Sequence, residues 1–357
     1  MKKKNLRSKI MLYLRSAFLA NSRIYAEIFF ARNKQKYINT IDDFKGNTIS
    51  QEQRLEILKH MKRAWVKFHW SAEEYFLYGY EKLTDQERAQ YLSDFDRSCF
   101  CTRVNDQGKS EIFRRKWKTY EVFKPYFKRE AVLVRGSKDI AKQEAVDFLE
   151  RHNSAIMKPL TNSCGHGIVL FHANSKEEAL QKYRDIITSN DTSYIMEELI
   201  EQSEEMAEFH PNSVNTVRMF TFKLKDEVRI LYAGIRFGIN NTFVDNTGSG
   251  GIYSSVDVAT GKVCTVSVDG MGNEFANHPN SGKQILGFQI PKWEQLTCLA
   301  KELALIVPEV KTVGWDFALT DKGWVLVEGN DRAQFHYYQV PMRKGFMNEF
   351  KQIQRLM

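Results

Sequence analysis

The chain has 357 residues, of which 52 are basic and 44 acidic, leaving a formal net charge of +8. This length suffices for two or three compact regions, and the 43% hydrophobic and 13% aromatic content excludes a disordered chain. The basic excess suits anionic partners such as nucleotides or acidic lipids. Because it is confined to two segments and accompanies no nucleic-acid motif, we expect no nucleic-acid partner.

The five cysteines are odd in number, and none lies in a Cys-X-X-Cys pair. This pattern argues against a disulfide framework and against a zinc site, and it predicts a reducing, cytoplasmic environment.

The first 20 residues combine basic and apolar side chains. Leu6, Ile10, Leu14 and Ala17 recur at helical spacing, and Arg15 interrupts an apolar run too short to span a bilayer. We expect an amphipathic basic helix. Two positions for it stay open: packed on the body of the protein, or peripheral to the acidic inner face of a membrane.

Residues 1–104 are expected to form a mainly helical N-terminal region. One helix is expected from Gln51 to Trp70, with an apolar stripe that includes Leu55 and Trp65, and Thr84-Asp-Gln-Glu87 has the pattern of a capping box.

Residues 105–200 form a second predicted region. It opens with a basic, aromatic helix over 114–128 that Pro125 stops or kinks. The order strand, helix, strand, strand, helix, strand follows, at 131–134, 139–151, 155–158, 168–171, 176–188 and 194–197.

Residues 201–357 form the third predicted region. Strands are expected at 217–224, 228–237, 251–257 and 263–268, followed by a helix at 293–305, a hairpin, and a C-terminal helix from about residue 344.

The hairpin consists of two apolar runs, 315–319 and 324–328, joined by Asp321-Lys322-Gly323. This turn sequence between alternating apolar residues is a strong hairpin signal. Pairing of Leu319 with Val325 would fix which residues of the two strands lie opposite each other.

In that register Asp316 lies opposite Glu328, and the two-residue alternation of a strand puts Asn330 on the same face. Two carboxylates and an amide oxygen suit Mg²⁺, which completes its coordination with water and phosphate oxygens. The alternative is the solvated face of an ordinary hairpin.

Three further patterns fit an anionic ligand. Lys158 ends a strand just before the small-residue segment Thr161–Gly167, where a lysine and backbone amides can contact phosphate; an ordinary exposed turn is the alternative. Arg218 and Arg236 lie on apolar strands, where an unpaired charge is costly. A buried carboxylate partner and a bound phosphate are equal alternatives for Arg218.

Taken in order, these elements resemble the ATP-grasp superfamily, specifically the sugar-transfer-associated ATP-grasp proteins of polysaccharide biosynthesis. The resemblance covers roughly residues 105–332 and implies an α+β fold in which two α+β subdomains clasp ATP. It rests on Met157-Lys158-Pro159, Gly165-His-Gly167, Met196-Glu197-Glu-Leu199-Ile200, Glu204, Asn215-Thr-Val-Arg218 and Asp316…Glu328-Gly-Asn330. The helical N-terminal region departs from that family pattern, so the surface for the acceptor substrate is not transferred.

The resemblance also implies ATP and Mg²⁺ as cofactors and a role for each matching residue. Arg218 and Lys158 would be catalytic, with Arg218 neutralising the transferring phosphate. Asp316, Glu328 and Asn330 would bind Mg²⁺. ATP would be bound by Lys158, Gly165 and Gly167 at its phosphates, Glu197 and Leu199 at adenine, and Glu204 at ribose. A second phosphate-binding lysine would be Lys116, with Lys109 as the alternative.

The activity implied by this resemblance is a carboxylate–amine or carboxylate–thiol ligase that acts through an acyl phosphate. Its substrates would be a small acid or amine, or a sugar nucleotide, leading to a modified cell-surface polysaccharide precursor. Two alternatives stay open: a phosphotransferase with a hydroxyl acceptor, and a non-catalytic nucleotide- or glycan-binding partner of a glycosyltransferase.

Overall fold

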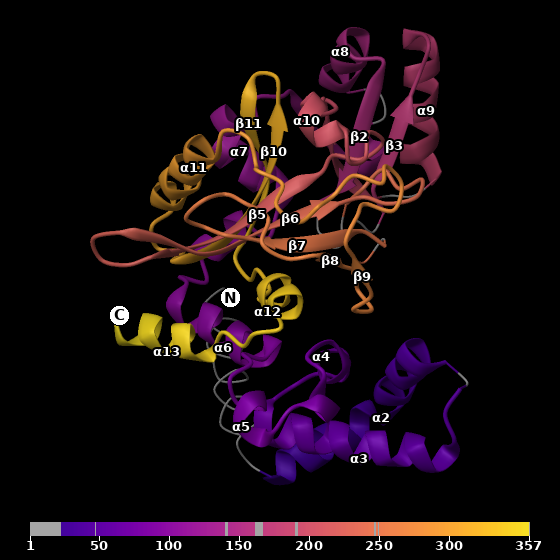
Figure 1. Ribbon diagram of the computed structural model, residues 1–357. Coiled ribbons are helices and arrows are strands. Elements are labelled where there is room, and N and C mark those ends of the chain that lie inside the picture. Colours follow the sequence, from indigo (N-terminus) through magenta and orange to yellow (C-terminus); the bar gives the residue numbers. More distant parts are fainter. Residues whose placement is uncertain are drawn as a thin grey trace, which may run out of the picture. The chain divides into compact units, whose positions relative to one another are not determined.

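The computed structural model describes residues 23–46, 48–139, 142–160, 167–189, 192–245, 248 and 250–356. The chain divides into two compact units, one comprising the residues up to Arg103 together with Gln334–Met357, and the other Val104–Ala333 (Figure 1). The contacts thus group the last segment with the N-terminal helices, whereas the sequence had grouped it with the strands after residue 201. The basic helix expected within the first 20 residues lies outside the described residues.

The first unit is helical, as expected. Its helices are α2 (Arg23–Lys45), α3 (Gln51–Phe68), α4 (Ala72–Leu77), α5 (Asp85–Arg88), α6 (Asp94–Val104), α12 (His336–Met342) and α13 (Met347–Arg355). None of the described helices is long and apolar enough to cross a membrane.

Helix starts in this unit agree with the sequence signals. Thr84 forms the predicted capping box with Glu87, and Ser50 and Ser71 form equivalent boxes at α3 and α4. The stripe predicted on α3 is wrong at Leu55, which is 52% exposed, whereas Trp65 is buried.

Gln339 joins the last segment of the chain to the first unit. Its side chain is fully buried, donates to the hydroxyl of Tyr78 and the carbonyl of Leu92, and accepts from the amides of Leu92 and Phe346. All of these bonds are between 2.8 and 3.0 Å long. A buried amide with every polar atom satisfied specifies one mode of packing.

The second unit contains a small sheet that follows helix α7 (Lys116–Phe127). The elements are β1 (Ala131–Arg135), α8 (Gln143–Arg151), β2 (Ser154–Pro159), β3 (Val169–His172), α9 (Lys176–Ser189) and β4 (Ser193–Glu197). The strands are antiparallel in the order β1-β4-β2-β3. Phe148 of α8 and Tyr183 of α9 lie with Met157 and Met196 in one core, so both helices cover the same face. The predicted order of elements is confirmed.

Helix α7 is kinked, as expected for a helix that contains Pro125. The non-helical residue is Phe123, two positions before the proline, with φ −110° and ψ 16°. The proline ring clashes with the preceding turn, which moves the distortion upstream.

The large sheet has the order β11-β10-β5-β6-β7-β8-β9. Its strands are β5 (Thr216–Lys223), β6 (Val228–Phe237), β7 (Ile252–Val256), β8 (Ser267–Val268), β9 (Glu274–Phe275), β10 (Thr312–Thr320) and β11 (Gly323–Asn330), and helix α11 (Trp293–Ile306) packs against β5 and β6. The strand predicted over 263–268 is too long: only Ser267 and Val268 form β8, and Val263 makes an isolated bridge to Val256.

The predicted register of the β10–β11 hairpin is wrong at its turn but right at its open end. Leu319 pairs with Trp324 rather than with Val325. The register then shifts between Asp316 and Phe317, so that Val327 is left over as a bulge and Asp316 faces Glu328. The extra residue Val327 shifts the pairing by one position, which cancels the error at the turn. From Glu328 onward the pairing is therefore the predicted one.

Candidate active site

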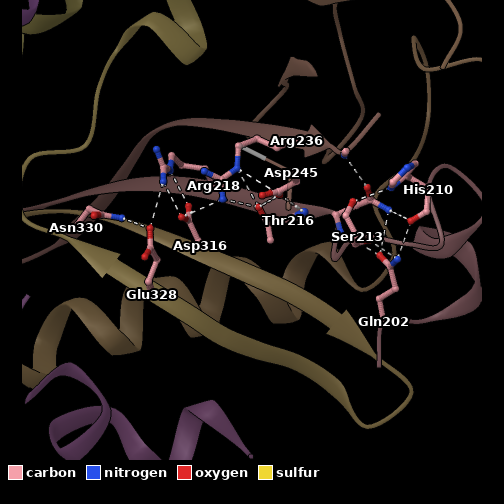
Figure 2. Close-up of polar contacts among 12 residues, drawn as sticks. Gln202, His210, Ser213, Thr216, Arg218, Arg236, Asp245, Asp316, Glu328 and Asn330 are labelled. Carbon is pink, nitrogen blue, oxygen red and sulfur yellow. Dashed lines mark hydrogen bonds and ion pairs between the residues drawn. The ribbon is translucent and has the colours of Figure 1, made fainter. Parts of the chain in front are cut away.

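A row of charged side chains crosses one face of the large sheet (Figure 2). Asp316 on β10 is paired with Glu328 on β11 and with Arg218 on β5. Thr216, two residues before Arg218, is paired with Arg236 on β6. Directly paired residues of neighbouring strands point to the same side, so the register alone brings these groups together.

Asp316 lies at the centre of the row and is fully buried. Its carboxylate accepts from Nε and Nη2 of Arg218, each at 2.6 Å, and lies 3.0 Å from Nη2 of Arg236. Burial alone would raise the pKa of Asp316, but the two guanidinium groups lower it to about 2. The structure therefore shows a buried carboxylate as the partner of Arg218.

Glu328 and Asn330 form the more accessible end of the row. Nδ2 of Asn330 donates to Oε1 of Glu328 at 3.0 Å, and Nη2 of Arg218 lies 3.9 Å from the same oxygen. The side chain of Glu328 is 43% exposed.

The predicted metal ligands are thus brought to one face, and their hard oxygen donors fit Mg²⁺. Asp316 can contribute to such a site only when its bonds to the guanidinium groups are exchanged. No group of three or more acidic, histidine or cysteine side chains suited to a metal occurs among the described residues.

Arg236 is held by two residues that the sequence did not single out. Its Nε and Nη2 donate to Oγ1 of Thr216 at 3.0 and 2.7 Å, and Nε lies 3.5 Å from the carboxylate of Asp245. Burial raises the pKa of Asp245, against the opposing effect of Arg236. Asp245 lies in a loop, where no periodicity could have indicated its burial.

The small sheet contributes a second buried charge cluster, around Glu197 on β4. Its carboxylate lies 3.1 Å from Nζ of Lys158 on β2 and 2.7 Å from Nε of Arg129. Burial would raise the pKa of Glu197, but Arg129 and Lys158 hold it below its usual value. Arg129 also donates to the carbonyl of Leu326 on β11 at 2.7 Å, which connects the two sheets. The sequence did not point to Arg129, because this residue lies between a helix and a strand, outside any motif.

The structure separates the two candidates for a second phosphate-binding lysine. The pKa of Lys116, at the start of α7, is lowered, mainly by burial. The charge of Lys158 lowers it further, and the carboxylates of Glu328 and Glu197 oppose the shift. Lys109 instead lies 4.0 Å from Glu309, with a side chain that is 54% exposed. The pKa of Lys116 thus responds to charged groups of both sheets, whereas the ion pair of Lys109 is with a residue outside them.

The remaining predicted residues lie on the connector after β4, on α10 and in the segment before β3. Leu199 is half-buried in the connector after β4, and Glu204 is exposed at the start of α10 (Glu204–Ala207). Gly167 has φ 75°, a left-handed conformation that favours glycine. Gly165 lies outside the described residues.

Two antiparallel sheets, one carrying the lysine and the other the acid pair, define an ATP-grasp protein, and a family model confirms this class and the expected α+β fold. The model, described as sugar-transfer associated ATP-grasp, matches residues 96–355. The chain belongs to the sugar-transfer associated ATP-grasp family. No curated protein matches its sequence.

The solved structures that the chain matches include ligases at low sequence identity. D-alanyl-alanine synthetase A from Vibrio cholerae is 9% identical with a TM-score of 0.44, and the match covers 70% of this chain and 66% of that one. The D-Ala:D-Ser ligase VanG from Enterococcus faecalis is 13% identical with a TM-score of 0.44, over 71% and 64%. The N5-carboxyaminoimidazole synthase of Aspergillus clavatus, solved with ADP, is 10% identical with a TM-score of 0.39, over 71% and 57%. The chain thus spans less than two thirds of the length of each of these three structures.

Proposed function

We propose that the protein is an ATP- and Mg²⁺-dependent ligase that activates a carboxylate as an acyl phosphate and joins it to an amine or thiol. The observation that carries this proposal is a pair of buried charge clusters, one on each sheet. Lys158 pairs with Glu197 on the small sheet. Arg218 pairs with Asp316, opposite Glu328, on the large sheet. Cations matched to buried carboxylates can exchange those partners for phosphate oxygens.

In this reaction the side chains position the substrates and stabilise charge, and none of them acts as a covalent nucleophile. Lys116 and Lys158 would bind the phosphates of ATP, and Arg218 would balance the charge on the transferring group. Mg²⁺ held by Glu328 and Asn330 would neutralise negative charge on the phosphate oxygens. The substrate carboxylate attacks the γ-phosphorus and ADP leaves; the acceptor nitrogen or sulfur then attacks the acyl carbon and phosphate leaves.

The sugar-transfer association of the family supports an acceptor among the precursors of cell-surface polysaccharides. The substrates would be a small acid with an amine, or an amino-bearing sugar nucleotide. A cytoplasmic site of action, with peripheral attachment through the basic N-terminal segment, completes the proposal.

The first test is the binding of Mg-ADP, measured as a rise in melting temperature. Lys116→Ala should lose most of this rise, because a phosphate partner is removed. Lys118→Ala is the matched control: it lies on the same helix with an exposed side chain and should keep the rise. Equal shifts in the two variants would contradict the role of Lys116, and the absence of any shift in the parent protein would contradict the nucleotide site.

The second test traps the activated acid. Incubation with ATP, Mg²⁺, a panel of carboxylic acids and hydroxylamine should yield a hydroxamate, because hydroxylamine attacks an acyl phosphate. ADP formation with a sugar and without hydroxamate would instead show a phosphotransferase. Binding of Mg-ADP without turnover of any acceptor in the panel would favour the non-catalytic partner.

A further inference from the structure

Asp316 has two incompatible sets of partners. Both of its oxygens accept hydrogen bonds from Arg218, and Oδ2 also lies 3.0 Å from Arg236. A cation that approached this carboxylate would meet two guanidinium groups at hydrogen-bond distance. The residue predicted to bind Mg²⁺ is therefore held by arginine in the structure.

The two arginines differ in how firmly the protein holds them. Arg236 makes two hydrogen bonds to Thr216 and lies near Asp245, so it retains acidic and hydroxyl partners when Asp316 turns away. Arg218 instead contacts both acids of the predicted metal set, Asp316 at 2.6 Å and Glu328 at 3.9 Å. Arg218 is thus the group that competes most directly with a metal ion.

We propose that Arg218 is a latch that closes the metal site until a polyphosphate binds. Phosphate oxygens then accept from the Arg218 guanidinium, and Asp316 becomes available as a ligand together with Glu328 and Asn330. This inference rests on the proposed nucleotide site and adds an order to it: the nucleotide binds before the metal ion or together with it.

The physical reason is the cost of leaving a buried charge without a partner. A metal ion alone would have to take Asp316 and Glu328 from Arg218, whose side chain is only 9% exposed, and would supply no anion in their place. A phosphate supplies a replacement anion of matching geometry. Because binding coupling is reciprocal, nucleotide and metal should increase each other's affinity by the same factor.

Mn²⁺ in place of Mg²⁺ allows binding to be measured directly by electron paramagnetic resonance, without turnover. The full-length protein should bind little Mn²⁺ alone and should bind it stoichiometrically when ADP is added. ADP should bind in the presence of a chelator, more weakly than with Mn²⁺. Glu328→Gln should remove the ADP-dependent Mn²⁺ signal, which identifies the bound ion with this site.

Arg218→Gln should raise the affinity for Mn²⁺ without nucleotide by about tenfold or more, since one charged competitor is removed. Arg229→Gln is the matched control, because Arg229 lies on β6 with a side chain that is 45% exposed and paired with Glu227. Circular dichroism would establish that both variants fold, and the wild-type measurements test the latch without either variant.

Two results would overturn the latch. Tight Mn²⁺ binding to the wild-type protein without nucleotide, lost in Glu328→Gln, would show that Arg218 does not close the site. A folded Arg218→Gln variant with unchanged Mn²⁺ affinity would show the same. Failure of ADP to bind under any condition would overturn the proposed function, and the latch with it.

Discussion

Glu328 and Asp316 differ in exposure, and this difference decides what the replacement of each should do. Asp316 is fully buried and paired with Arg218 and Arg236, so its removal would take from Arg218 the carboxylate that accepts two of its hydrogen bonds. Glu328 is 43% exposed and accepts one hydrogen bond from Asn330, so a neutral isostere is tolerated there.

We expect Glu328→Gln to abolish Mg²⁺-dependent ATP turnover while the midpoint of urea unfolding stays close to that of the wild type. The amide keeps the size of the side chain but loses the charge that a hard cation requires. Glu294→Gln, an exposed change on α11, is the control and should leave both measurements unchanged. Near-normal turnover in Glu328→Gln would contradict its assignment as a metal ligand.

At the scale of elements, the open end of the β10–β11 hairpin depends on a glycine. Gly314 pairs with Asn330, and a Cβ atom added to Gly314 would lie 2.1 Å from the Cβ of Ala333. The position of the third predicted ligand therefore depends on a close backbone approach that only glycine permits.

Gly314→Ala should lower the free energy of unfolding by about 1–3 kcal/mol through overpacking. The double variant Gly314→Ala/Ala333→Gly should recover most of this loss, because the second change removes the atom that clashes. Urea denaturation of the two single variants and the double variant gives the coupling energy. Additive effects, with no recovery in the double variant, would show that the close contact is not the cause.

Element types were predictable because they depend on local patterns. The hairpin turn at Asp321-Lys322-Gly323, the capping box at Thr84 and the succession of helices and strands along residues 131–197 all follow from nearby residues. The bulge at Val327 could not be predicted from nearby residues, because it is set by pairing with β10 rather than by the β11 sequence. Leu55 was misplaced because an apolar residue at helical spacing can still lie on the edge of the buried face.

The candidate site was predictable only in part, for the same physical reason. Arg218 and the acid pair stood out because charge in an apolar strand needs a partner, but the sequence could not say which partner. Lys158 stood out because it ends a strand just before a glycine-rich segment. Arg129, Thr216 and Asp245 act through contacts between segments far apart in the chain. Only the three-dimensional arrangement of the strands reveals such pairs.

At the scale of the whole molecule, the buried carboxylates make stability depend on pH. The pKa of Glu197 is held below its usual value, and that of Asp316 is lowered to about 2. A carboxyl with a lowered folded-state pKa contributes stability above its unfolded pKa and loses it as the pH falls through the folded value. The stability contributed by these two carboxyl groups should therefore decline once the pH falls below their ordinary values of 4.5 and 3.8 toward 2.

Glu197→Gln tests this dependence. At neutral pH it should lower the free energy of unfolding by about 3–5 kcal/mol, because Arg129 and Lys158 lose their buried partner. Its stability should also fall less steeply than that of the wild type as the solution is acidified. Glu201→Gln, an exposed change on the same connector, should reproduce the wild-type curve, measured by urea unfolding at a series of pH values. Parallel curves for Glu197→Gln and the wild type would contradict this account.

Arg129 has a mechanical consequence for the second unit. One guanidinium group binds Glu197 of the small sheet and the carbonyl of Leu326 in the large sheet, at 2.7 Å in each case. A point fixed to both bodies acts as a pivot, so any rocking of one sheet against the other displaces nearby atoms little and distant atoms more. Lys158, which shares Glu197 with the pivot, would hold its place while β3, at the outer edge of the small sheet, sweeps the longest arc. Lys158 would then keep its position relative to the large sheet during such rocking.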